Sequence, residues 1–137
     1  MIELRETTNE DLANAHIHCL PIFIDASPTL LPGMVTVFTG ESILAVFSAN
    51  RIWDGVVLFG AILTERVYAH PVAFVRIIKK YLREFEQKGI HRMQMDVPTE
   101  YEAGHRFAKA LGFKAEGVMK MFGPTKKDYT LYARTHE

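Results

Sequence analysis

The chain has 137 residues, a length typical of one domain, and its 16 acidic and 16 basic side chains give a formal net charge of zero. A zero net charge argues against general binding to nucleic acids or anionic membranes, because such proteins usually carry a net basic field. The single cysteine, Cys19, excludes an internal disulfide, and no apolar run approaches the roughly 20 residues that a membrane span needs, so we expect one cytoplasmic domain over residues 1–137.

The first half of the chain is predicted to form a strand, a helix and three further strands. Ile2 and Leu4 alternate with polar residues in a short strand, and the sequence of Thr7–Glu10 is typical of a capping box that opens a helix. We expect this helix to end near Pro21, and residues 21–33, with three prolines, to be irregular or at most a short helix. The strands expected next span residues 35–38, 43–47 and 56–63.

The second half begins with a helical pattern. After Pro71 the apolar residues recur every three or four positions, which predicts an amphipathic helix that ends at Gly89. Pro71 suits the first turn of this helix because the amide hydrogen that proline lacks is not needed there. The elements expected after it are a strand over residues 93–97, a helix from a second capping box at Thr99–Glu102 to Gly112, and an antiparallel pair over residues 113–121 and 128–133.

This order of elements predicts an α+β fold. We expect a mixed, mostly antiparallel central sheet of about seven strands, with helices on both faces. Hairpins indicate the antiparallel pairs, and the helices that follow the strands over 56–63 and 93–97 indicate crossovers. Sheets of this kind favour a binding site beyond the carboxyl ends of strands that splay apart.

Several stretches carry a resemblance to a known superfamily. The strand Ile90–Val97 is followed by a helix that ends in Leu111-Gly112-Phe113 and then by Glu116-Gly117, and the chain opens with a strand, an arginine and an acidic cap over Leu4–Asp11. On these residues the chain resembles the GNAT N-acetyltransferase superfamily, over nearly its whole length in element order. The resemblance implies a GNAT-like sheet splayed between the fourth and fifth strands, with the pantetheine arm of acetyl-CoA in the gap.

The resemblance also implies a turn after the fourth strand that holds the diphosphate of acetyl-CoA at a helix start. The family builds this turn with glycines, which permit positive φ and close backbone approach. Counted back from Gly89, the turn falls at Ala69–Phe74, which has no glycine and includes Pro71 without an N–H. We interpret the site as degenerate, with bulky side chains filling the turn, although a helix N-terminus with Arg66 and Arg76 nearby remains. The residues assigned to cofactor binding by the resemblance are Leu63, Thr64, Ala69, His70, Val72, Ala73, Phe74 and Arg76.

The family's general acid is the next requirement. Many GNAT enzymes use a tyrosine on the last helix, at the position that Ala108 occupies here, and alanine cannot transfer a proton. Tyr101, two helical turns earlier on the same face, is the substitute candidate. Glu65 is the candidate general base and Asp96 the next, but Glu65 can equally be a solvated strand end and Asp96 can pair with a neighbouring Arg or Lys.

The remaining titratable residues have simpler interpretations. No grouping of His, Cys and carboxylates has the spacing of a zinc site, so we expect no metal. His70 can donate to a phosphate, but capping of the following helix is the favoured reading. We expect His105 on an exposed helix face and Cys19 as a small core residue.

The chain also resembles one particular branch of this superfamily. The stretch Arg106–Gly112 is similar to the Arg-Phe-x-Lys-x-Leu/Ile-Gly stretch of the small GNAT-like internal virion proteins of short-tailed phages. This implies a phage or prophage protein, in the cytoplasm or the virion, that contacts a phage or host protein without catalysis. The alternative is an active acetyl-CoA-dependent N-acetyltransferase that acts on an unknown amine. The apolar residues within 21–33 either cover the sheet or contact a second subunit in a homodimer.

Overall fold

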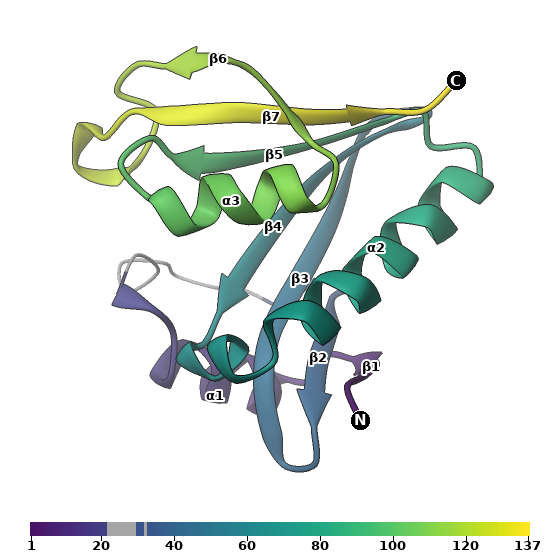
Figure 1. The fold of residues 1–137 in the computed structure, drawn as a ribbon, viewed down its shortest axis with the longest axis vertical. Helices are drawn as coiled ribbons and strands as arrows, with labels where there is room; N and C mark the ends of the chain where they lie inside the picture. Colours follow the sequence, from purple (N-terminus) through teal and green to yellow (C-terminus); the bar gives the residue numbers. More distant parts are fainter. Residues whose placement is uncertain (22–29, 32) are drawn as a thin grey trace. The chain divides into compact units, whose positions relative to one another are not determined.

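The computed structural model describes residues 1–21, 30–31 and 33–137, which form seven strands in one sheet and three α-helices (Figure 1). The strand order is β1-β2-β3-β4-β5-β7-β6, in which β4 and β5 run parallel. The strands are β1 (Glu3–Glu6), β2 (Val35–Thr39), β3 (Ser42–Trp53), β4 (Val56–Leu63), β5 (Arg92–Pro98), β6 (Lys114–Met119) and β7 (Tyr129–Thr135). The predicted α+β fold with a mixed, mostly antiparallel seven-stranded sheet is confirmed.

The helices begin close to their predicted positions, but the first ends at Ile17 rather than near Pro21. They are α1 (Asn9–Ile17), α2 (Pro71–Gln87) and α3 (Glu102–Ala110), and two short 3₁₀-helices, η2 (Glu65–Ala69) and η3 (Pro124–Lys126), are also present. Pro71 is the first residue of α2, as expected from its missing N–H. In the part of the chain that the structure describes, no helix is long and apolar enough to cross a membrane.

Both predicted capping boxes need correction. The first is shifted by one residue, because the Thr8 hydroxyl accepts the Asp11 N–H and the Asp11 carboxylate accepts the Thr8 N–H. The second does not form, since Tyr101 is the N-cap of α3 and makes no side-chain cap bond. The Thr99 hydroxyl lies 3.0 Å from the Thr130 hydroxyl of β7 and is hydrogen-bonded to it. The hydroxyl that the sequence predicts as the cap of α3 therefore bonds to a strand residue instead.

The described chain separates into two compact units. The first unit is Met1–Ala49 with Gly60–Ile77, and the second is Asn50–Phe59 with Ile78–Glu137. In the first unit a core cluster joins α1 to strand residues; its members are Leu12, Ala15, Met34, Ile43, Val46 and Ile62. The single domain expected over residues 1–137 stays a prediction, and most of the segment expected to be irregular, residues 22–29 and 32, lies outside the described residues.

In the second unit, aromatic packing holds α2 against β4. The rings of Phe59, Tyr81 and Phe85 lie edge to face, with centroids 5.0–6.2 Å apart. Burial, and then the charge of Glu84, raise the pKa of Tyr81 to about 12. The C-terminal part of α2 is therefore fixed by apolar contacts.

Candidate functional site

The end of β4 is held tightly within the first unit. Thr64 is fully buried; its N–H donates to the Leu44 carbonyl at 2.9 Å, and its hydroxyl donates to the Ile43 carbonyl at 2.9 Å. The Leu63 carbonyl accepts the N–H of Leu20, also at 2.9 Å. Two of the predicted cofactor-binding residues, Leu63 and Thr64, therefore already use these backbone groups inside the protein.

The turn between β4 and α2 is helical rather than a glycine bend. Val67 donates its N–H to the Thr64 carbonyl, and His70 donates to the Val67 carbonyl, so that η2 leads directly into α2. Among residues 63–77, all of which the structure describes, none has a positive φ. The left-handed backbone for which glycine is suited is therefore not used between β4 and α2.

The start of α2 presents few backbone donors. The first four N–H groups of an α-helix have no partner within the helix, and here Pro71 has none to offer. The Phe74 N–H donates to the His70 carbonyl at 2.9 Å, which is the first hydrogen bond of α2, while capping by the His70 side chain stays a prediction. Val72 and Ala73 carry the remaining N–H groups of the first turn, and the side chains of both are exposed.

Phe74 lies in the core instead of the turn. Its side chain is 1% exposed, and its ring packs on Phe47 of β3 with centroids 6.1 Å apart. Val72 is 69% exposed and points away from the core. The expectation that bulky side chains fill this turn is therefore wrong for Phe74, because a large apolar group gains more from core burial than from an exposed bend.

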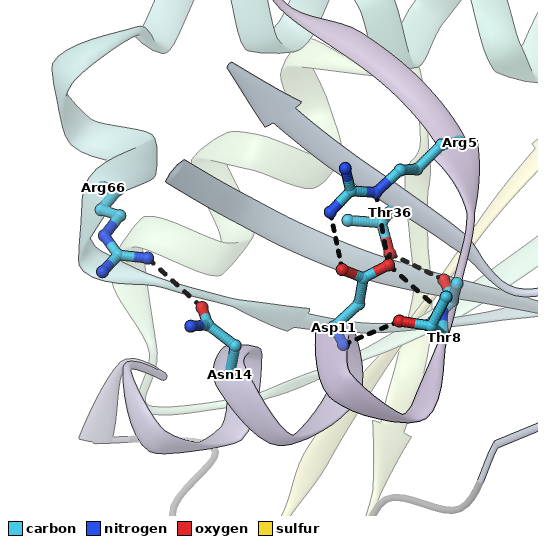
Figure 2. A network of polar contacts seen from close by, with 7 residues as sticks. Arg5, Thr8, Asp11, Asn14, Thr36 and Arg66 are labelled. Carbon is cyan, nitrogen blue, oxygen red and sulfur yellow. Dashed lines mark hydrogen bonds and ion pairs between the residues drawn. The ribbon is translucent and has the colours of Figure 1, made fainter. Parts of the chain in front are cut away.

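The charged residues near the turn are mostly solvated. Glu65 is exposed at the start of η2, as in the solvated alternative, and Arg76 is exposed on α2. Arg66 donates to the Asn14 side-chain oxygen at 3.5 Å, which joins η2 to α1 (Figure 2). Arg66 thus has a structural partner, whereas Arg76 is the exposed cation nearest the start of α2 in sequence.

A network around Asp11 links β1, α1 and β2 (Figure 2). The Arg5 guanidinium lies 2.7 Å from one carboxylate oxygen, while the Thr8 N–H and the Thr36 hydroxyl donate to the other at 3.2 and 3.3 Å. Burial raises the pKa of Asp11, but the hydrogen bonds from these donors outweigh it and hold the pKa below its usual value. Asp11 is therefore a structural anion rather than a proton carrier.

In the second unit, Tyr101 covers a glycine. A Cβ at Gly104 would lie 2.6 Å from the Tyr101 ring and 2.6 Å from Val97 Cγ1, so only glycine lets α3 approach both side chains. Ala108, where the resemblance places the general acid, is fully buried. Glu65 belongs to the first unit and Tyr101 to the second, and their catalytic roles stay predictions.

The sequence predicts His105 on an exposed helix face, but the structure shows both of its ring nitrogens in hydrogen bonds. Its Nε2 lies 2.8 Å from the Thr99 carbonyl and its Nδ1 lies 2.6 Å from the Tyr132 hydroxyl. Because a carbonyl only accepts, neutral His105 carries its proton on Nε2, and Tyr132 donates to Nδ1. Burial, and then the charge of Glu102, raise the pKa of Tyr132, which keeps this donor protonated. Sequence reasoning missed the contact because Tyr132 lies 27 residues away.

Asp96 differs from the expected ion-paired carboxylate. It is half-buried on β5, and within the described chain no Arg or Lys pairs with it. Burial raises the pKa of Asp96, since water no longer fully solvates the charge. The pKa of Tyr129 on β7 is raised as well, first by burial and then by the Asp96 charge.

The remaining candidates concern metals and Cys19. Cys19 packs against the core cluster of the first unit and forms an isolated bridge with Thr64, as expected of a small core residue. Among the residues that the structure describes, no group of three or more His, Cys, Asp or Glu side chains is placed to hold a metal ion.

The sequence matches no protein-family model, and no curated protein matches it. The fold, in contrast, is found in many solved structures of acetyltransferases. The ribosomal-protein-S18-alanine N-acetyltransferase of Escherichia coli is 14% identical, with a TM-score of 0.75 over 98% of this chain and 94% of that one. The ribosomal-protein-S5-alanine acetyltransferase of Vibrio fischeri is 15% identical, with a TM-score of 0.77 over 98% of this chain and 92% of that one.

A third structure includes a ligand. The Bacillus subtilis acetyltransferase in complex with CoA is 14% identical, with a TM-score of 0.73 over 99% of this chain and 98% of that one. At such low identity these likenesses establish the fold alone, and that fold is the GNAT fold. What the individual site residues do is a separate question.

Proposed function

We propose that this chain is a GNAT-fold protein that has lost acetyl-CoA-dependent catalysis and acts by binding other molecules. One observation carries the proposal: the backbone from Glu65 to Phe74 runs through η2, a single non-helical residue, His70, and the first turn of α2 without positive φ, and Pro71 stands where an amide donor is needed. A diphosphate needs several N–H groups that converge on it. Only Val72 and Ala73 carry such groups in the first turn of α2 besides the engaged Phe74, so the residues present do not fit the diphosphate.

The general-acid position supports the same conclusion. Ala108 has no proton to give, and it is completely buried. The substitute, Tyr101, packs its ring over Gly104 at the start of α3. Two independent requirements of acetyl transfer, cofactor binding and proton donation, are therefore weakened by different residues.

Binding of acetyl-CoA tests this proposal directly. In a thermal-shift series with the full chain, we expect no change in the unfolding temperature at millimolar acetyl-CoA. A true ligand at 100 times its dissociation constant would stabilise the fold by roughly 2.7 kcal/mol. The Bacillus subtilis acetyltransferase, run in parallel, shows that the assay detects CoA. A saturable upward shift for this chain would overturn the proposal.

The biological setting that we propose is a phage or prophage, where the protein acts in the virion, in particle assembly or on the host. Support comes from the similarity of Arg106–Gly112 to the corresponding stretch of the GNAT-like internal virion proteins. The neighbouring genes test this part independently of CoA binding. Virion or prophage genes beside this one are expected, and a chromosomal neighbourhood without them would contradict the assignment.

An N-acetyltransferase acting on an unknown amine is the second candidate. Its support is the fold, which matches acetyltransferases over nearly their whole length, one of them in complex with CoA. In that case the Val72 and Ala73 amides, together with Arg76, would hold the diphosphate, with Glu65 and Tyr101 as the catalytic candidates. The thermal-shift series separates the candidates, because only this one requires stabilisation by acetyl-CoA.

A further inference from the structure

The sheet ends on one side at β6, which is exposed along its length. Among the described residues, β7 is the only strand that pairs with β6, and β6 lies outermost beside β7 in Figure 1. Five of its six residues are exposed, and the sixth, Met119, is half-buried. Because an edge strand has N–H and C=O groups on its outer side that no ladder satisfies, β6 offers backbone donors and acceptors to a further strand.

The two edge strands of the sheet differ in how they are protected against such pairing. Natural edge strands are usually protected by charged side chains, by bulges or by being short. β1 is short, and three of its four residues are charged: Glu3, Arg5 and Glu6. β6 has a bulge before Gly117, but the residues after the bulge, Gly117–Met119, carry no charge. This part of β6 is therefore open to pairing with another chain.

Exposed apolar side chains accompany this open backbone. Val118 is 51% exposed, and Met121 and Phe122, in the turn that follows β6, are 62% and 56% exposed. The Phe122 ring nevertheless has a fixed place, since it packs on the Tyr129 ring with centroids 5.5 Å apart. Neighbouring exposed apolar side chains of this size mark interaction surfaces more often than scattered ones do. The outer side of β6 thus combines unpaired backbone groups with apolar side chains that gain from burial.

The charges beside β6 form two separate ion pairs. Glu116 accepts a hydrogen bond from Arg92 at 3.1 Å, and the Lys120 ammonium lies 3.0 Å from the Asp128 carboxylate. The two members next to the edge remain accessible, because the Glu116 side chain is 41% exposed and that of Lys120 is 79% exposed. Each of them can therefore take a second partner of opposite charge on its outer side.

The order of these charges along β6 is complementary to itself. Two copies of one strand that pair antiparallel are related by a two-fold axis, so a register centred on Val118 places Glu116 of each copy opposite Lys120 of the other. A register centred on Gly117 would place Lys114 opposite Lys120, and one centred on Glu116 would oppose two glutamates. Because like charges directly opposite each other destabilise a strand pair, the register centred on Val118 is favoured.

We propose that β6 pairs antiparallel with β6 of a second copy of this chain, centred on Val118, so that the two sheets become one. The Glu116 carboxylate of each copy binds the Lys120 ammonium of the other, which extends the ion pairs with Arg92 and Asp128 across the interface. An interface of two strands is small and therefore weak, so the dimer forms as the concentration rises. The proposal does not involve the start of α2 and stands whether or not acetyl-CoA binds.

Sedimentation velocity of the full chain tests this dimer. We expect the wild type to change from monomer to dimer between micromolar and millimolar concentration. Val118→Lys opposes two like charges at the centre of the interface and should weaken the dimer at least about tenfold. Val118 is half exposed in the monomer, so the fold should tolerate the lysine. Urea unfolding of each variant confirms that it is folded before it is sedimented.

A charge exchange tests the register. Glu116→Lys opposes two lysines across the interface and Lys120→Glu opposes two glutamates, so we expect each variant alone to be monomeric at concentrations where the wild type dimerises. An equimolar mixture of the two variants should restore the dimer, because both ion pairs form again between the two different chains. The matched control is Lys80→Glu, the same change at an exposed position on α2, which should dimerise as the wild type does.

Three results would overturn the proposal. They are a wild type that stays monomeric at millimolar concentration, dimerisation of Val118→Lys with the affinity of the wild type, and a mixture of the two folded charge variants that remains monomeric. If Glu116→Lys fails to fold because it loses its bond to Arg92, the comparison of Val118→Lys with the wild type still decides the question.

Discussion

At the scale of single residues, two aspartates in different surroundings have opposite effects on the stability of the fold. Asp11 is buried but surrounded by donors, among them Arg5 at 2.7 Å and the Thr8 N–H at 3.2 Å. Asp96 is half-buried with no donor in the described chain. The same residue type therefore stabilises the fold in one place and costs stability in the other, and only the three-dimensional neighbours decide which.

Replacing Asp11 should destabilise the protein. Asp11→Asn removes the charge from the bonds to Arg5, Thr8 and Thr36, and hydrogen bonds to charged groups contribute about 1.5–3 kcal/mol. We expect a loss of about that size in the free energy of unfolding, measured in urea at neutral pH. Glu10→Gln, an exposed neighbour, is the control and should change it by less than about 0.5 kcal/mol.

The stability difference between the wild type and Asp11→Asn should depend on pH, and this dependence follows from the pKa of Asp11. Because the folded protein lowers this pKa from its ordinary 3.8, the charged form stabilises the fold above pH 3.8, and this stabilisation is lost as the pH falls through the lower folded value. The gap between wild type and Asp11→Asn should therefore close in strong acid. A gap that is independent of pH would contradict the assigned charge interaction.

Asp96→Asn should not destabilise the protein at neutral pH, in contrast to Asp11→Asn. Folding raises the pKa of Asp96 above 3.8, so ionisation costs stability as the pH rises from below 3.8 through the folded value. At neutral pH we expect the variant to be at least as stable as the wild type in urea, with an advantage that disappears below pH 3.8. Marked destabilisation at neutral pH would show that the carboxylate has a stabilising partner.

At the scale of elements, sequence periodicity predicts α2 and its first residue but not the conformation of the turn before it. Pro71 and the apolar spacing depend on local rules, which a sequence displays directly. The orientation of Phe74 depends on Phe47 in a distant strand. For the same reason the second capping box failed, since Thr99 bonds to Thr130, a residue 31 positions away.

The start of α2 gives a prediction at this scale. Phe74→Ala should lower the free energy of unfolding by about 3–5 kcal/mol, because it leaves a cavity against Phe47. Val72→Ala, at an exposed position in the same turn, should change it by less than about 0.5 kcal/mol. Chemical denaturation of both variants measures the difference. If the two were equally destabilising, Phe74 would not be the core anchor described here.

At the scale of the whole molecule, the order of the elements is enough to predict the seven-stranded α+β fold, and the solved acetyltransferase structures confirm it. The candidate site is less predictable. The missing glycines and Ala108 can be read from the sequence, whereas the unpaired state of Asp96 and the His105–Tyr132 bond depend on strand register. The fold alone does not decide the function, which depends on the residues of the site.

The claim that the start of α2 no longer holds CoA is tested most directly at its two amides. In a titration of the ¹⁵N-labelled full chain with coenzyme A, we predict that the backbone amide signals of Val72 and Ala73 do not move at millimolar ligand. The Bacillus subtilis acetyltransferase serves as the positive control. Saturable shifts of these two signals with coenzyme A, absent with adenosine, would contradict the account and favour the active N-acetyltransferase.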